Sequence, residues 1–341
     1  MKNSNNTGKI TSNKSVKHAL IVIGMHRSGT SATTGALQCL GIQLGSKLYQ
    51  GHQNINEKGY FEHSDIADTN EEALLALGST WDDVLLKPDL WWQSEKLKPY
   101  AARIKYFIQR DFQHAKLWAV KDPRVSRLLP WWLSILQDEG ISPYFVFVLR
   151  SPQAVYCSLK KRDGFSREKA FLLWTLHYLE AENYSRDFPR TFIDFDQFIE
   201  APHAQLARVS QQLNLSFPVS LTEAKPCLNQ HLSKGLRHHA NTPCNYKSDN
   251  SIIDLTMRVY QTLFACTLSG HAALDYRLMA HFRDEIEHLQ SDYPPFLIEQ
   301  LIRLGVQNGS KQLGINRLIK SWSWGVGKPI RYLERCIGRD I

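Results

Sequence analysis

The chain has 341 residues, of which 43% are hydrophobic and 22% charged, and its formal net charge is +8. This length and composition favour one α/β domain of moderate size with additional helices, and no apolar run is long enough to span a membrane. The positive charge comes without a helix-turn-helix, zinc-finger or RNP-type signature, so nucleic acid is not the expected partner.

The ends of the chain and its cysteines bear on its compartment. Met1 to Lys17 is rich in Asn, Ser, Thr and Lys and lacks an apolar segment, which predicts a disordered tail and not a signal peptide. The cysteines show no paired spacing, and no His/Cys cluster has zinc spacing, so we expect no transition-metal site and a reducing, cytoplasmic environment. The cysteines are Cys39, Cys157, Cys227, Cys244, Cys266 and Cys336.

The segment Ala19 to Leu40 reads as a buried strand, a glycine-bounded loop and the start of a helix. Met25 to Gly29 must turn sharply between them. In such a loop, backbone N–H groups and the positive end of the helix point at one spot, and Arg27 adds a forked donor for phosphate or sulfate oxygens. The pattern predicts a phosphate-binding loop, the alternative being a plain strand-to-helix turn.

The loop departs from the usual nucleotide-binding pattern at one position. Gly24, Gly29 and Ser31 match the Walker A pattern, but Thr30 stands where that pattern has its lysine. An ordinary ATPase or GTPase is therefore disfavoured.

Two further strands are predicted to end in polar residues. Leu117 to Val120 leads into Lys121-Asp122-Pro123-Arg124, and Tyr144 to Leu149 leads into Arg150. Ligands of open parallel sheets bind at the carboxyl ends of the strands. Pro152 suits the first turn of the next helix, which carries Ser158. Arg150 alone would be a solvated charge at a strand end, and its pairing with Ser158 and the first loop favours a second anion site. Two such sites would fit a nucleotide with phosphate at both ends of its ribose, which ATP lacks.

These motifs resemble those of sulfotransferases that use 3′-phosphoadenosine 5′-phosphosulfate (PAPS). The resemblance covers Ala19 to Pro202 and implies a P-loop-type central parallel sheet flanked by helices, here with extra C-terminal helices. It implies that Arg150 and Ser158 hold the 3′-phosphate. It also implies that the 5′-phosphosulfate is bound by Arg27, Ser28, Gly29, Thr30 and Ser31.

The general base must be sought outside the third strand, because Lys121-Asp122-Pro123-Arg124 resembles bacterial members and lacks the histidine of the cytosolic animal enzymes. Asn56 to His63 resembles a stretch of bacterial carbohydrate sulfotransferases, with Glu57 replacing a proline. Glu62 lies there between an aromatic pair and a helix predicted over 64–77, a setting where partial burial favours uptake of a proton.

Other residues compete for these catalytic roles. Helix capping is the other role of Glu62, and His26, His63 and Asp122 are the alternative bases. His26 adjoins the loop and is also placed to contact the transferring group. Lys121 is expected to stabilise charge on the leaving phosphate or to pair with a neighbouring acid.

The rest of the chain is less informative. A helix is predicted over Arg167 to Arg186, with its aromatic stripe in the core, and a strand over Arg190 to Phe195. Pro226 to Tyr246 is expected to be loop-rich. The basic segment from Lys311 to Ile341 carries Trp322 and Trp324 and resembles the tail of some bacterial glycosyltransferases. Attachment to the inner face of the membrane is a hypothesis, and the alternative is that the tryptophans pack on the domain.

The sequence thus predicts three regions: a tail over 1–17, a sulfotransferase domain over 18–310 and a basic amphipathic tail over 311–341. The expected reaction moves a sulfuryl group from PAPS to a carbohydrate or glycolipid hydroxyl without a metal, as in bacterial surface-polysaccharide synthesis. The alternatives are a P-loop nucleotide kinase and a non-catalytic binding protein. The acceptor and the oligomeric state are not predicted.

Overall fold

The computed structural model describes residues 17–50, 59–232, 251–269 and 274–291, together with positions 307, 310 and 311. Its described strands form one four-stranded sheet in the order β2-β1-β3-β4, with every neighbouring pair parallel. The strands are β1 (Lys17–Ile23), β2 (Leu117–Lys121), β3 (Ile141–Leu149) and β4 (Arg190–Asp194). Because the strands are parallel, their carboxyl ends all lie at one edge of the sheet.

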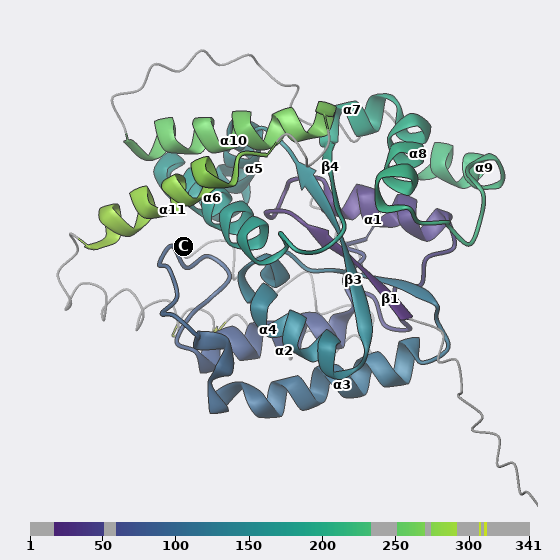
Figure 1. Ribbon diagram of the computed structural model, residues 1–341, viewed down its shortest axis with the longest axis horizontal. Coiled ribbons are helices and arrows are strands. Elements are labelled where there is room, and N and C mark those ends of the chain that lie inside the picture. The colour runs from purple at the N-terminus through teal and green to yellow at the C-terminus, as the bar shows by residue number, and fades with distance from the viewer. Residues whose placement is uncertain are drawn as a thin grey trace, which may run out of the picture.

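Helices cover both faces of this sheet (Figure 1). They are α1 (Thr30–Cys39), α2 (Ser64–Ala76), α3 (Lys98–Phe112), α4 (Arg124–Asp138), α5 (Pro152–Asp163), α6 (Arg167–Tyr184), α7 (Phe195–Glu200), α8 (Pro202–Leu213), α9 (Leu221–His231), α10 (Ser251–Ser269) and α11 (Tyr276–Ser291). Two short 3₁₀ turns, Trp91–Gln93 and Glu95–Leu97, precede α3.

The two faces of the sheet bury two separate cores. Ile21 and Phe147 face a core shared with α2 to α6, α10 and α11, whereas Val22 and Val148 face a core shared with α1 and α7 to α9. Alternation along each strand sends neighbouring side chains to opposite faces, which explains why β1 and β3 are continuous apolar runs. The predicted α/β class with a parallel sheet and extra C-terminal helices is confirmed.

Most predicted elements lie within a few residues of their expected ends. The helix predicted over 64–77 is α2, and Pro152 occupies the first turn of α5 as expected. The aromatic stripe of α6 is buried in the core, with Trp174 fully buried. The prediction of a loop-rich excursion from Pro226 is wrong over its first turns, because Pro226 lies inside α9. Residues 233–246 lie outside the described residues, as do 1–16 and 312–341.

The structure also corrects the expectation drawn from the cysteines, which show no paired spacing in the sequence. Cys39, the last residue of α1, forms a disulfide with Cys227 of α9 across 188 residues of sequence. Spacing along the chain does not reveal this pair, because it is created by the packing of α9 on α1. No helix in the described ranges is both long and apolar enough to cross a membrane.

Candidate active site at the carboxyl edge of the sheet

The loop between β1 and α1 has the backbone that the sequence predicts. Arg27 and Gly29 both have positive φ, at +70° and +89°, and Thr30 opens α1. A left-handed residue other than glycine costs about 1 kcal/mol, so Arg27 is held there by its surroundings. A loop of this shape, next to the N-terminus of α1, is suited to direct backbone N–H groups at an anion.

Close packing fixes both glycines of the loop. A Cβ on Gly29 would lie 2.0 Å from the ring of Phe195, and a Cβ on Gly24 would lie 2.7 Å from Cγ2 of Thr30. Thr30, at the position of the Walker lysine, is buried, and its methyl group lies against Gly24. Ser28 is also fully buried and closes the turn through its N–H to the carbonyl of Met25.

The structure brings together the basic residues predicted for the two phosphates. Arg27 donates from Nε to Ser158 Oγ at 2.7 Å, and Arg150 donates from Nη1 to the carbonyl oxygen of Arg27 at 3.0 Å. β1 and β3 are neighbours in the sheet, which explains why the residues that follow them meet. Burial lowers the pKa of both guanidinium groups. The charge of Arg150 adds to the lowering of the Arg27 pKa, so an anion bound between the two guanidinium groups would reduce their mutual repulsion, and the arrangement favours anion binding.

Phe195, a residue that the sequence reasoning missed, supports this cluster. Its ring contacts Gly29, and the guanidinium of Arg150 lies 5.0 Å from the ring centroid. Phe195 begins α7 directly after β4, at the same edge of the sheet. Its position directly after a predicted strand, next to Asp194, is the sequence feature that could have identified Phe195 as part of the site. The carbonyl of Arg150 in turn accepts a hydrogen bond from Trp174.

Lys121 and Glu62 form a buried ion pair beside the loop. The Nζ atom of Lys121 lies 2.5 Å from Glu62 Oε1 and also donates to the carbonyl of Tyr60 at 2.8 Å. That carbonyl accepts a second hydrogen bond from Ser31 Oγ at 3.2 Å, which links the pair to the first turn of α1. Oε2 of Glu62 makes no hydrogen bond within the described residues. Of the roles open to Lys121, pairing with a neighbouring acid is therefore confirmed.

Asp122 is engaged in a network of its own behind this pair. Its Oδ1 accepts from Arg124 Nη1 at 2.9 Å, and its Oδ2 accepts from Asn70 at 2.9 Å. Arg124 also lies 2.5 Å from Glu71. Burial opposes the charge of Arg124, but Asp122 and Glu71 raise its pKa well above the usual value. With both of its oxygens bonded, Asp122 is a poorly placed proton acceptor.

His63 caps a helix. Its Nδ1 accepts from the N–H of Ile66 at the start of α2, and its Nε2 lies 2.5 Å from Asp111 Oδ2. The capping role considered for Glu62 thus belongs to the next residue, and both ring nitrogens of His63 are engaged.

His26 lies one residue before Arg27, with its ring 4.4 Å from that of Trp81. Burial lowers its pKa well below the usual value, with smaller contributions from Arg162 and Arg124. Its Nε2 atom is buried and has no hydrogen-bond partner in the part of the chain that the structure describes. His26 is therefore a neutral imidazole adjoining the anion site.

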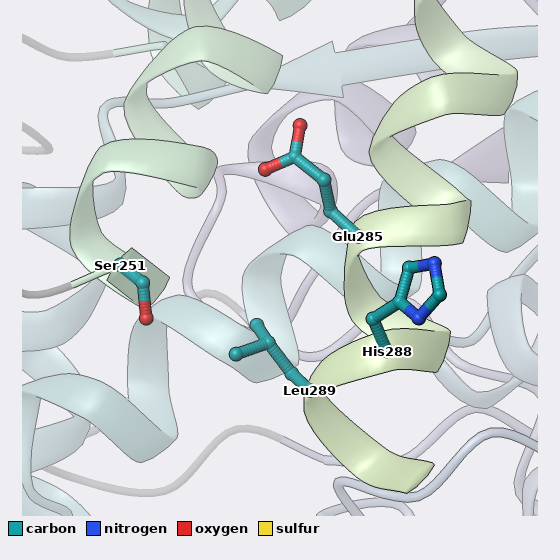
Figure 2. A pocket seen from close by; sticks show the side chains of 4 residues that line it. All are labelled: Ser251, Glu285, His288 and Leu289. Carbon is teal, nitrogen blue, oxygen red and sulfur yellow. The ribbon is translucent and has the colours of Figure 1, made fainter. Parts of the chain in front are cut away.

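A separate hollow lies between α10 and α11, lined by Ser251, Glu285, His288 and Leu289 (Figure 2). The carboxylate of Glu285 is already paired with Arg258, at 2.6 and 2.8 Å. The hollow contains none of the residues that gather at the carboxyl edge of the sheet, so it is not the candidate active site.

Comparison with known proteins gives similarity at the level of structure. No family model and no curated protein matches the sequence. The chain is similar to the sulfotransferase STF1 from Mycobacterium tuberculosis H37Rv, with 15% identity over 63% of this chain and 72% of that one and a TM-score of 0.39.

Two sulfotransferase domains are similar to the same extent. For the domain of the Synechococcus PCC 7002 olefin synthase, the identity is 16% over 73% of this chain and 94% of that one, with a TM-score of 0.42. For the domain of the curacin biosynthetic pathway, it is 14% over 73% and 98%, with a TM-score of 0.39.

Proposed function

We propose that this protein is a sulfotransferase that moves a sulfuryl group from PAPS to a hydroxyl of a carbohydrate or glycolipid acceptor. The observation that carries the proposal is the meeting of Arg27, Ser158 and Arg150 at the end of two neighbouring strands, beside a loop without the Walker lysine. Such a site supplies charged donors for two phosphate-type groups close together, as a 3′,5′-bisphosphorylated nucleotide requires.

The residues present fit that nucleotide. The backbone of Arg27 to Ser31 and the Arg27 side chain would hold the 5′-phosphosulfate, and Arg150 with Ser158 would hold the 3′-phosphate. When bound, PAPS supplies the sulfuryl group and a phosphate leaving group. The acceptor oxygen then bonds to sulfur while the bond from sulfur to the phosphate oxygen breaks, and the electron pair leaves with the phosphate.

Lys121 and Glu62 divide the remaining chemistry. The acceptor hydroxyl loses a proton as it bonds to sulfur, and Glu62 Oε2, which has no partner in the described part of the chain, receives it. Lys121 stabilises the charge that develops on the leaving phosphate and orients Glu62 through its 2.5 Å contact. Because a sulfuryl group carries less charge than a γ-phosphate, these cations serve without a divalent metal.

Transfer of radiolabelled sulfate tests the proposal directly. The protein is incubated with ³⁵S-labelled PAPS and mixed bacterial surface glycans, with and without EDTA, and labelled glycan is separated and counted. We expect transfer that persists in EDTA. Transfer of phosphate from labelled magnesium-ATP, with none from PAPS, would identify a nucleotide-dependent kinase, and binding of PAPS without any transfer would identify a binding protein.

A further inference from the structure

A cluster of buried polar side chains lies next to the anion site, between the loop, α4, α6 and residues 80–90. Three of its nitrogen atoms are buried and have no hydrogen-bond partner among the described residues: His26 Nε2, His177 Nε2 and Lys87 Nζ. None of these atoms takes part in the helix cap formed by His63 or in the Lys121–Glu62 ion pair. Buried polar atoms without partners are rare in folded proteins, so three in one cluster indicate a missing ligand or ordered water.

The three side chains are connected in space. The rings of His26 and His177 lie 6.5 Å apart, with an interplanar angle of 75°. One turn along α6, Glu180 accepts from Arg127 at 2.9 Å and lies 3.9 Å from Lys87 Nζ. Burial lowers the pKa of His177, and the charges of Arg127 and Lys87 add to that shift. The cluster thus extends from the residue before Arg27 to the segment that contains Lys87.

The segment that carries Lys87 is held in place. Arg127 donates to the carbonyls of Asp83 and Leu85 at 2.8 and 2.7 Å. Gln290 of α11 bonds the same segment on its other side, to Val84 and Leu86. These two sets of hydrogen bonds fix the segment that carries Lys87, so the missing hydrogen bond of its ammonium is not the consequence of a loose loop.

The hydrogen-bonding capacity of the cluster suits hydroxyl groups. His177 Nδ1 lies 2.8 Å from the carbonyl of Leu173, so Nδ1 carries the hydrogen and Nε2 is an acceptor. Lys87 offers only donors. Hydroxyl groups both donate and accept, so a molecule with several of them satisfies His177 and Lys87 together.

The charges of the cluster favour a ligand without charge. The two cations, Arg127 and Lys87, are matched by the two carboxylates of Glu180 and Asp83. Burial lowers the pKa of His177 to about 3, so its imidazole is neutral. An anionic ligand at His177 and Lys87 would add a negative charge that this balanced group around Lys87 does not neutralise, which is costly.

We propose that His177 and Lys87 bind the ring hydroxyls of a neutral, polyhydroxylated acceptor, and that this contact presents one hydroxyl to the transfer site beside His26. The inference rests on the proposed function and deepens it, because it names the acceptor as a neutral sugar ring and assigns two residues to its recognition.

The test uses the full chain, saturated with 3′-phosphoadenosine 5′-phosphate (PAP). Saturation-transfer NMR titrates the methyl glycosides of glucose, galactose and N-acetylglucosamine against glucuronate. The variants are His177→Leu, which removes the acceptor atom, His177→Gln, which restores one, and Lys87→Met. His281→Gln, with its side chain 65% exposed on α11, is the matched control.

We expect at least one neutral glycoside to bind more tightly than glucuronate. His177→Leu and Lys87→Met should each weaken that binding about tenfold, as expected for loss of a buried hydrogen bond, at unchanged PAP affinity. His177→Gln and His281→Gln should stay within about threefold of the wild type.

Three results would overturn the inference: no glycoside binds the PAP complex, glucuronate binds best, or the Leu and Met variants bind sugar as the wild type does. Each of them leaves PAP binding intact, so it would count against this inference alone. If the wild-type protein does not bind PAP, the proposed function itself fails.

Discussion

Arg27 and Ser158, which are 131 residues apart in sequence, are joined by a hydrogen bond of 2.7 Å from the guanidinium to the hydroxyl. This contact ties the loop after β1 to the helix after β3. Each residue was expected from the sequence to serve a different phosphate, and the order of the strands places them together. One connected set of hydrogen-bond donors is therefore predicted to bind the phosphates at both ends of a bisphosphorylated ribose.

Replacing Arg150 by alanine should weaken PAP binding by about ten- to a hundredfold, because a charge-assisted hydrogen bond contributes about 1.5–3 kcal/mol. Binding of ADP, which has no 3′-phosphate, should change far less. Isothermal titration calorimetry measures both. Arg277→Ala, at an exposed position on α11, is the control. Equal losses for PAP and ADP would contradict the assignment of Arg150 to the 3′-phosphate.

Gly29→Ala should abolish PAP binding and destabilise the fold, because it adds a methyl group against Phe195 to an unfavourable φ. Gly140→Ala is a matched control: its φ is +66°, but a Cβ there meets nothing within 4 Å. Urea unfolding should show a loss of about 1 kcal/mol for Gly140→Ala and about 1–3 kcal/mol more for Gly29→Ala.

The double variant Gly29→Ala/Phe195→Ala separates the two causes. Removal of the ring relieves the overlap, so Gly29→Ala should cost less stability in the Phe195→Ala background than in the wild type. If the double variant is no more stable than the sum of the single changes predicts, Phe195 does not confine the loop.

The elements of the fold were predictable because their signals are local. An apolar run that ends in glycine or arginine marks β1 and β3, and Pro152 marks the start of α5. The partners of the site residues were less predictable. Nothing in the sequence indicates that Lys121 forms its ion pair with Glu62 and not with Asp122, because this pairing depends on how the segment before α2 packs against β2.

The Cys39–Cys227 disulfide and the role of Phe195 escaped sequence reasoning for the same reason. Both are contacts between elements far apart in the chain. The helix cap is a milder case: the right boundary was predicted for α2, but the cap is His63 and not its neighbour Glu62.

Glu62→Gln should lower kcat by about 10²–10⁴-fold, the range for loss of a general base, with PAP affinity retained. The amide oxygen of glutamine can still accept from Lys121, so the fold should survive. Single-turnover transfer from PAPS measures the chemical step, and Glu287→Gln, an exposed change on α11, is the control. If the chemical step is unchanged in Glu62→Gln, another residue is the general base, and His26 is the next candidate.

His177 should make the protein sensitive to acid. Burial, with Arg127 as the next cause, lowers its folded pKa to about 3, against about 6.5 for an unfolded histidine. Between these values the unfolded chain binds a proton that the folded protein does not, so this residue reduces stability as the pH falls from 6.5 toward 3.

His177→Gln removes that proton site. The difference in unfolding free energy between wild type and variant, followed by urea denaturation from pH 7 to pH 4, should therefore shift in favour of the variant as the pH falls. A difference that stays constant with pH would show that His177 titrates normally.

The most direct test of the central claim is calorimetric binding of PAP compared with ADP and ATP, each with and without magnesium. The site built from Arg27, Ser158 and Arg150 predicts that PAP binds most tightly and that magnesium changes its affinity little. Preference for magnesium-ATP over PAP would contradict a sulfotransferase site and favour a kinase.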